Sequence, residues 1–244
     1  MNIDIATLFP EMLENYLSQS IVGRARAKDI FTVKCHDIRA YTKDKHRRVD
    51  DTPYSEQKGM LMQCDPIFNC YEAVTEGREK PHVIYMSPQG KTLTQQRCRE
   101  LAAMDNIFIL CGHYEGVDER IIETLVDEEI SIGDYVLTGG ELPALVLVDA
   151  VVRMLDGTLS QPDCYEDESH YNGLLEYPQY TRPEVWHDMR VPEILLSGHH
   201  ANIKKWRHEQ ALITTAKKRP ELLEKVELSD EDLAIIHKVV DFNK

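Results

Sequence analysis

Hydrophobic and polar positions along residues 1–155 predict strands that are each followed by a helix. Apolar stretches of strand length occur at residues 1–8, 31–36, 83–86 and 106–111. Helical spacing or composition occurs at residues 10–17, 94–103, 118–125 and 141–155. Strands that alternate with helices indicate an α/β domain with a mainly parallel sheet.

The last of these helical stretches, Glu141–Leu155, is apolar on nearly every face. A helix of this kind has to be covered on all sides. Cover from the same chain and cover from a partner subunit are both compatible with the pattern.

Residues 156–190 are polar, rich in Asp, Glu, Tyr and Pro, and without periodicity. Such a segment is typically a linker, a lid or a binding segment. After it, residues 201–216 and 233–240 have helical patterns, and Ser229 with Asp232 resembles a capping box before the last helix. We therefore predict a domain at 1–160, a linker or lid at 161–190 and a small all-helical domain at 191–244.

The composition suits a folded protein, because 42% of the 244 residues are hydrophobic. No apolar run approaches the roughly 20 residues that span a bilayer, and the first ten residues lack the basic start of a signal peptide. We expect a cytoplasmic protein. The cysteines have no CxxC spacing and are predicted to be scattered reduced thiols: Cys35, Cys64, Cys70, Cys98, Cys111 and Cys164.

The formal net charge of −14 argues against nucleic-acid binding, because phosphate contacts require Lys and Arg. The distribution of charge matters more than its sum, however. Residues 43–48 and 204–219 are locally basic. Each of these stretches is either a solvated face or a phosphate-binding surface.

Three glycine-containing turns each follow a predicted apolar strand, at residues 87–90, 111–116 and 132–143. In open α/β sheets, ligands bind beyond the carboxyl ends of the strands. Glycine there lets backbone N–H and C=O groups approach a ligand closely, for example along a purine edge. The signatures of P-loop, Rossmann dinucleotide, zincin and α/β-hydrolase sites are missing from the sequence.

Longer motifs occur in a fixed order along the chain. They are LFPEM at 8–12, VDD at 49–51, SPQG at 87–90, CGHYEGVDER at 111–120, SIGDYVL at 131–137, GGELP at 139–143, YTRP at 180–183 and LLSG at 195–198. Together they resemble the bacterial tRNA (guanine-N1)-methyltransferase family, often called TrmD. The resemblance runs from Met1 to about Leu228.

The resemblance implies a SPOUT-class α/β fold with a deep trefoil knot, a rare exception to unknotted topology. It implies a homodimer that transfers a methyl group from S-adenosylmethionine to N1 of guanine 37 of tRNA when a guanine precedes it, with magnesium in support. The implied contacts to the methyl donor are Tyr85, Ser87, Pro88, Gln89, Gly112, Tyr114, Glu115, Gly116, Ile132, Gly133, Tyr135, Val136, Leu137, Gly139, Gly140 and Pro143. The implied contacts to tRNA are the basic C-terminal helices and Arg24, His46, Arg47 and Asp50.

The chemistry requires a base and a cation. Guanine N1 has to lose a proton to become a nucleophile, which a carboxylate can accept, and an arginine can stabilise the charge that moves to O6. By resemblance the arginine is Arg153. The base falls on Glu168, where the family has Asp, with Asp167 beside it. Either Glu168 serves with an adjusted geometry, or the loop shifts and Asp167 serves.

Residues 55–58 are Ser-Glu-Gln-Lys, where the family has a run of glycines. Residues with a Cβ cannot adopt all the backbone conformations of glycine. Two alternatives follow from these departures: a related SPOUT RNA methyltransferase with an altered target, and a degenerate tRNA-binding paralogue with weak activity.

Overall fold

The computed structural model describes residues 1–54, 59–159, 165 and 167–241. The chain divides into two compact units, residues 1–161 and 162–244. The glycine-replacing residues 55–58 and Cys164 lie outside the described residues.

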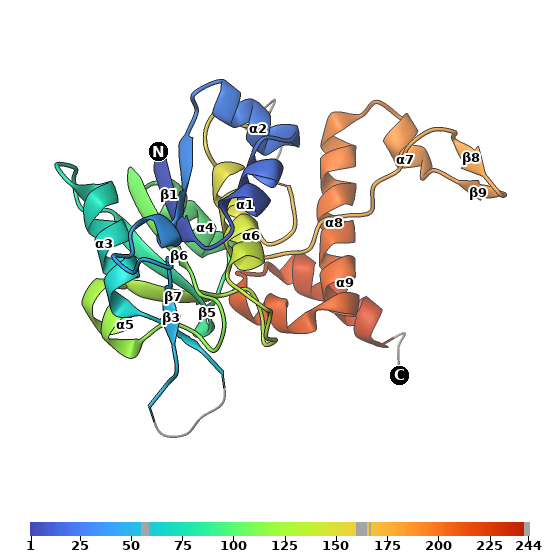
Figure 1. The fold of residues 1–244 in the computed structure, drawn as a ribbon. Helices are drawn as coiled ribbons and strands as arrows, with labels where there is room; N and C mark the ends of the chain where they lie inside the picture. The colour runs from blue at the N-terminus through green and yellow to red at the C-terminus, as the bar shows by residue number, and fades with distance from the viewer. Residues whose placement is uncertain (55–58, 160–164, 166, 242–244) are drawn as a thin grey trace. The chain divides into compact units, whose positions relative to one another are not determined.

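A five-stranded sheet forms the centre of the first unit (Figure 1). Its strands are β1 (Asn2–Thr7), β2 (Thr32–Asp37), β5 (His82–Thr92), β6 (Asn106–Cys111) and β7 (Glu128–Ser131). Their order is β2-β1-β6-β5-β7, and every neighbouring pair is parallel. The predicted α/β architecture with a mainly parallel sheet is confirmed.

Helices cover both faces of this sheet. One hydrophobic core joins it to α1 (Pro10–Leu17), α2 (Ser20–Ala27), α4 (Gln95–Ala102) and α6 (Glu141–Val152). The other joins it to α3 (Cys64–Thr75) and α5 (Glu119–Leu125). Smaller elements are η1 (Ile38–Ala40) and the pair β3 (Asp50–Asp51) and β4 (Leu61–Met62). Both faces are apolar because successive side chains of a strand point to opposite sides, and both sides here are buried.

The strand β5 differs from the prediction. The sequence pattern ends this strand at Met86 and follows it with a turn, whereas the strand continues to Thr92. Residues 87–90 form a bulge, because Met86 and Lys91 both lie opposite Ile130. Gly90 fits this bulge because a Cβ on it would lie 2.3 Å from the backbone carbon of Glu129.

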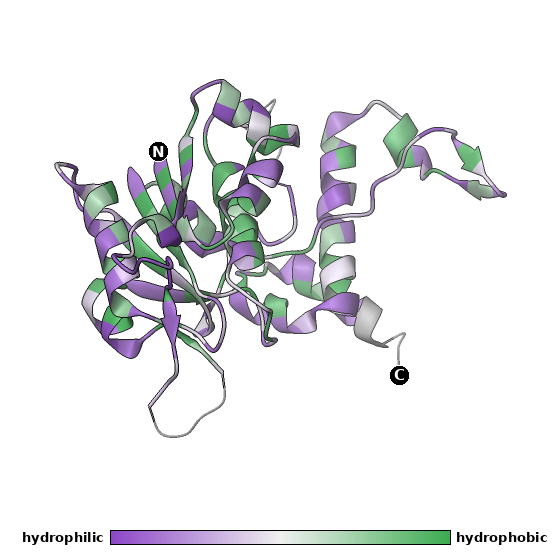
Figure 2. Ribbon diagram, in the orientation of Figure 1, coloured by the Kyte–Doolittle hydropathy of each residue, from purple (hydrophilic) through white to green (hydrophobic). Residues whose placement is uncertain are grey.

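The apolar helix α6 is covered mostly within its own chain. Its buried apolar residues belong to the first core. Leu142 and Val146 nevertheless remain 50% and 46% exposed. Met12 and Tyr16, on the neighbouring helix α1, are similarly exposed. Figure 2 shows the apolar character of α6 along its length.

The second unit contains α7 (Glu193–Leu196), α8 (His200–Lys218), η3 (Pro220–Lys225) and α9 (Asp230–Asp241). The capping box is present, because the Ser229 N–H donates to the Asp232 carboxylate at 3.0 Å and the Asp232 N–H donates to Ser229 Oγ at 3.2 Å. A small hairpin, β8 (Val185–Trp186) and β9 (Met189–Arg190), lies in the segment where the sequence indicates no regular structure. Its two-residue turn has positive φ at both positions, as type I′ turns require.

Candidate functional site

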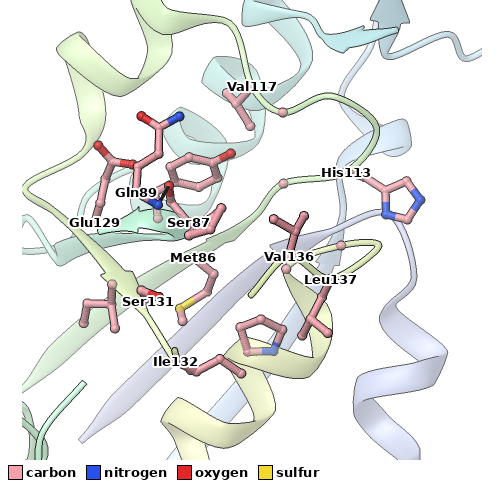
Figure 3. Close-up of a pocket in the computed structure, with 18 of the residues that line it drawn as sticks. Met86, Ser87, Gln89, His113, Val117, Glu129, Ser131, Ile132, Val136 and Leu137 are labelled. Atoms are coloured by element: carbon pink, nitrogen blue, oxygen red, sulfur yellow. Dashed lines mark hydrogen bonds between the residues drawn. The ribbon is translucent and has the colours of Figure 1, made fainter. Parts of the chain in front are cut away.

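A cavity of about 350 Å³ lies where β5, β6 and β7 end, within the size range of small-molecule sites. Three segments line most of it: residues 85–90 of β5 with its bulge, the loop at residues 112–117, and residues 130–140 from the end of β7 onward (Figure 3). The lining includes every residue that the sequence predicts to contact the methyl donor. Contact of these residues with a donor remains a prediction.

Two of the loops touch through their backbones. The Gly140 N–H donates to the Gly112 carbonyl at 2.8 Å, and His113 forms an antiparallel bridge with Gly139. A Cβ on Gly140 would lie 2.8 Å from the Cys111 Cα. Since real Cβ atoms do not come so near a backbone atom, only glycine permits this contact between the loops.

The cavity is acidic. Glu115, Glu119 and Glu129 line it, and its lining, all of it in the described part of the chain, contains no Lys or Arg. Burial raises the pKa of Tyr85 to about 12, and the nearby Glu129 carboxylate adds to this effect, so its hydroxyl stays protonated at neutral pH. The electrostatics of the cavity therefore favour a ligand that carries positive charge.

Some lining residues were not predicted from the sequence. Glu119, His113 and Ser131 lie inside the motifs that carry the family resemblance, so the sequence offered a signal for them. Glu129 lies outside these motifs. It reaches the cavity because it pairs with Tyr85 across β5 and β7, and this register is not visible in the sequence.

The predicted catalytic arginine, Arg153, is the C-cap residue of α6. It lies outside the lining of the large cavity and borders a smaller one of about 120 Å³, together with Tyr16 and Asp149. The Tyr16 hydroxyl donates to the Asp149 carboxylate, and this hydrogen bond raises the Tyr16 pKa to about 12.

The two predicted carboxylates belong to the second unit and differ in environment. Asp167 is exposed, and its carboxylate lies 4.0 Å from the Arg207 guanidinium. Glu168 is half-buried, and its backbone is held by a bond to the Tyr165 carbonyl and a bond from the Tyr171 N–H, both 3.2 Å. The adjoining chain is fixed to α8, since the Leu175 N–H donates to the Thr215 hydroxyl at 2.9 Å.

The predicted tRNA-contacting residues are distributed over the first unit. Arg24 is exposed on α2, and Asp50 is half-buried in β3. His46 and Arg47 are exposed in a loop that Asp44 organises. The Asp44 carboxylate accepts from the His46 N–H at 2.8 Å and from Arg48 at 3.2 Å.

The second basic stretch lies on α8 and just after it. Lys204, Lys205, Lys217 and Lys218 are exposed along this helix. Arg207 is half-buried, with its guanidinium carbon 4.8 Å from the centre of the Tyr177 ring. The exposed lysines thus form a basic surface on an otherwise acidic chain.

Comparison with known proteins identifies related sequences along almost the whole chain. The family profile described as tRNA (Guanine-1)-methyltransferase TrmD matches residues 1–225. The tRNA (guanine-N(1)-)-methyltransferase of Ruminiclostridium cellulolyticum is 56% identical over 227 residues, which is 93% of this chain and 97% of the relative. A protein of the same description from Clostridium botulinum strain Hall is 51% identical over 244 residues, covering 100% of this chain and 99% of its own.

A solved structure is also similar. The crystal structure of tRNA (m1G37) methyltransferase from Aquifex aeolicus superposes with a TM-score of 0.75 at 40% sequence identity. The match covers 92% of this chain and 95% of the solved one.

Proposed function

The chain belongs to the tRNA (guanine-1)-methyltransferase family, and from this premise we propose that it methylates N1 of guanine 37 in tRNAs with guanine at position 36. S-adenosylmethionine is the donor that this activity implies. The observation that carries the proposal is one cavity whose lining includes every residue that the motifs assign to the methyl donor. The choice of guanine at position 37 follows the family resemblance and the m1G37 activity in the name of the Aquifex aeolicus relative.

The cavity suits S-adenosylmethionine in size, charge and backbone shape. Its volume of about 350 Å³ fits a ligand of this class, and its three carboxylates complement a cationic molecule. Gly140 leaves room for the loops to meet, where a Cβ would collide with Cys111. When bound, the donor supplies the methyl group from a positively charged sulfonium centre.

We propose that Glu168 removes the proton from guanine N1 and that Arg153 stabilises the negative charge on O6. The environment of the two candidate bases supports Glu168 over Asp167. Asp167 is exposed and lies 4.0 Å from Arg207, whereas the Glu168 backbone is held by two hydrogen bonds. A base has to sit within hydrogen-bond reach of the proton, so a fixed backbone favours Glu168.

We also propose a homodimer, as the resemblance implies. Met12 and Tyr16 on α1 and Leu142 and Val146 on α6 form an exposed surface, which we call the α1–α6 face. Exposed apolar side chains that gather on one surface are typical of protein interfaces. The knot of the SPOUT class belongs to this proposal too, and the contact between the loops at Gly112 and Gly140 supports it.

The remaining parts of the proposal concern the second unit, magnesium and location. Residues 191–244 are proposed to bind tRNA through the basic surface of α8, with 161–190 as linker or lid. Within the described residues, no group of three or more His, Cys, Asp or Glu side chains could hold a metal ion, so magnesium support rests on the resemblance. No described helix has the length and apolar character to cross a membrane. A cytoplasmic location remains a prediction.

Methyl transfer from labelled S-adenosylmethionine to tRNA transcripts tests the function. We expect transfer to a transcript with guanine at positions 36 and 37, and none when position 37 is adenine. Transfer that survives this change would favour a SPOUT methyltransferase with an altered target. Donor and tRNA binding without transfer would favour a degenerate paralogue.

A further inference from the structure

A buried carboxylate lies close to the residues that line the proposed donor cavity. Glu141, in the first turn of α6, is only 3% exposed. Its Oε1 accepts a hydrogen bond from Thr7 Oγ1 at 2.9 Å. A buried carboxylate is costly unless a cation or several hydrogen bonds compensate it, and one hydroxyl and a helix N-terminus compensate it only in part.

Among the described residues, the basic group that lies within 4 Å of this carboxylate is His113, in the loop that follows β6. Its Nδ1 lies 3.8 Å from Glu141 Oε2, beyond hydrogen-bond length. This Nδ1 is buried and has no hydrogen-bond partner among the residues that the structure describes. A small rotation of the ring would bring the unpartnered Nδ1 within hydrogen-bond distance of the Glu141 carboxylate, whose other oxygen already accepts from Thr7.

The two side chains connect the loops of the cavity. His113 lines the cavity and forms the backbone bridge with Gly139. Glu141 Oε2 lies against Gly139 as well, since a Cβ there would be 2.5 Å from it. Figure 3 shows the His113 ring turned away from Ser87 and Gln89.

We propose that Glu141 is a positioning residue for the methyl donor, acting through a protonated His113. Closure of the carboxylate–imidazolium pair holds the 112–116 loop and the loop at Gly139 in the shape that grips the donor. Preorganised loops raise affinity because less ordering remains for the ligand to impose. The inference rests on the proposed function, since it assigns S-adenosylmethionine to this cavity.

Other charged and titratable groups surround the imidazole. Cys111 of β6 stays neutral, because burial raises the pKa of its thiol well above the ordinary value, with Glu141 adding to the effect. The guanidinium carbon of Arg39 in η1 lies 6.0 Å from the centre of the Phe9 ring, and the His113 ring centre lies 5.1 Å from it. The loop that carries His113 contributes Tyr114 and Glu115. Among the described residues, Glu141 is the carboxylate that lies within 4 Å of a His113 ring nitrogen, at 3.8 Å.

Calorimetric titration of the full chain with S-adenosylmethionine between pH 6 and pH 8.5 tests the proposal. In the unmodified protein the dissociation constant should fall about tenfold toward pH 6, because protonation creates a charge-assisted bond. Glu141→Gln keeps an acceptor for Thr7 but loses the charge, so its affinity should vary less than about twofold over this range. His113→Gln should behave in the same way and serves if the first variant does not fold.

Thr7→Val is the matched control. It removes the hydrogen bond to the other oxygen of Glu141 but leaves the pair with His113, so the pH dependence should persist. A Glu141→Gln variant with the full pH dependence of the unmodified protein would overturn the proposal, as would a flat profile in the unmodified protein. Failure to bind the donor at any pH would instead reject the proposed function itself.

Discussion

At the scale of single residues, two adjacent carboxylates illustrate how environment separates like side chains. Asp167 is solvent-exposed, and its carboxylate lies 4.0 Å from the Arg207 guanidinium. Glu168 is half-buried in a turn whose backbone hydrogen bonds limit its motion. A general base needs a fixed distance to its proton, and the second environment offers that.

We therefore expect Glu168→Gln to lower the single-turnover rate of methyl transfer by on the order of a hundredfold or more. Asp167→Asn should change it by less than about threefold, because exposed pairs contribute little. Rapid-quench measurement with saturating donor and tRNA gives both rates. The opposite ranking would assign the base to Asp167.

Gly140 is a second residue with a sharp expectation. The Gly140→Ala substitution places a Cβ 2.8 Å from the Cys111 Cα, a backbone atom that cannot move aside cheaply. Donor affinity measured by calorimetry should fall by on the order of a hundredfold, because the two loops separate. Gly77→Ala serves as control: nothing lies within 4 Å of its Cβ, so only its positive φ is strained. Equal donor affinity in both variants would contradict the close-approach explanation.

At the scale of elements, the sequence predicted the helices and strands whose hydrophobic pattern is clear within the element itself. Strand β6 and helix α8 have strong patterns and lie within a few residues of their predicted bounds. Helices α2 and α3 were not predicted, since Gly23 in one and Pro66 in the other weaken the local signal. Tertiary packing compensates, because α2 and α3 bury apolar residues against the sheet.

The candidate site was likewise predicted where the signal is local in sequence and missed where it depends on tertiary structure. Glycine turns after strands predicted a pocket at the carboxyl ends, and the cavity lies there. Glu129 was missed because its position depends on the register between β5 and β7. The proximity of Glu141, Thr7 and His113 was missed too, since it joins three segments that are distant in sequence.

The loop around Asp44 supports a prediction for RNA binding. The hydrogen bond from Arg48 is the main cause that lowers the Asp44 pKa to about 2, so the carboxylate holds the loop at all physiological pH values. Asp44→Ala should weaken tRNA affinity about three- to tenfold by loosening His46 and Arg47, although it removes a negative charge. Filter binding measures this, with donor affinity as the control. Tighter tRNA binding by the variant would show that removing the negative charge of Asp44 matters more than the order it gives the loop.

The network that joins β1, β2 and the segment after α3 supports a prediction for stability. Asp4 is buried and accepts from His36 at 2.8 Å and Arg78 at 2.9 Å. Burial alone would raise the Asp4 pKa. The combined effect of His36 and Arg78 is larger and opposite, so the pKa lies below the usual 3.8. The group therefore stabilises the fold above about pH 4, and this stability is lost as pH falls through the folded-state pKa.

Asp4→Asn should lower the free energy of unfolding by about 2 kcal/mol at pH 7. The difference between variant and unmodified protein should shrink below about pH 4, where the carboxyl of Asp4 becomes protonated. Urea unfolding at pH 3, 5 and 7 measures both. A difference that stays constant across this range would exclude the ionised carboxylate as its source.

At the scale of the whole molecule, the net charge of −14 does not show where the positive and negative side chains lie. Exposed cations gather in the loop at 43–48 and along α8, while acidic side chains line the cavity that we propose for the methyl donor. An acidic protein can thus carry surfaces for phosphates and a cavity for a cation at once. Predictions from total charge alone would have excluded the function that the family membership establishes.

The α1–α6 face yields a prediction about assembly. Val146→Asp places a charge on this exposed apolar surface and should convert the proposed dimer to monomer, as a buried charge in an interface is costly. Sedimentation velocity measures the change. Phe68→Asp on α3 is the matched control, because Phe68 is a similarly exposed apolar residue on the other side of the sheet. Loss of the dimer in both variants would contradict the assignment of the interface.

One turn of α6 serves two surfaces, since Pro143 lines the cavity and its neighbour Leu142 lies on the α1–α6 face. In the proposed dimer, a ligand in the cavity would fix the same backbone that the second copy contacts. Ligand binding and dimer formation would then be linked, because each changes the free energy of the other by the same amount. Adding S-adenosylmethionine should shift the protein concentration at which half of the dimers separate, and small molecules that distort this turn would act as inhibitors of both binding events.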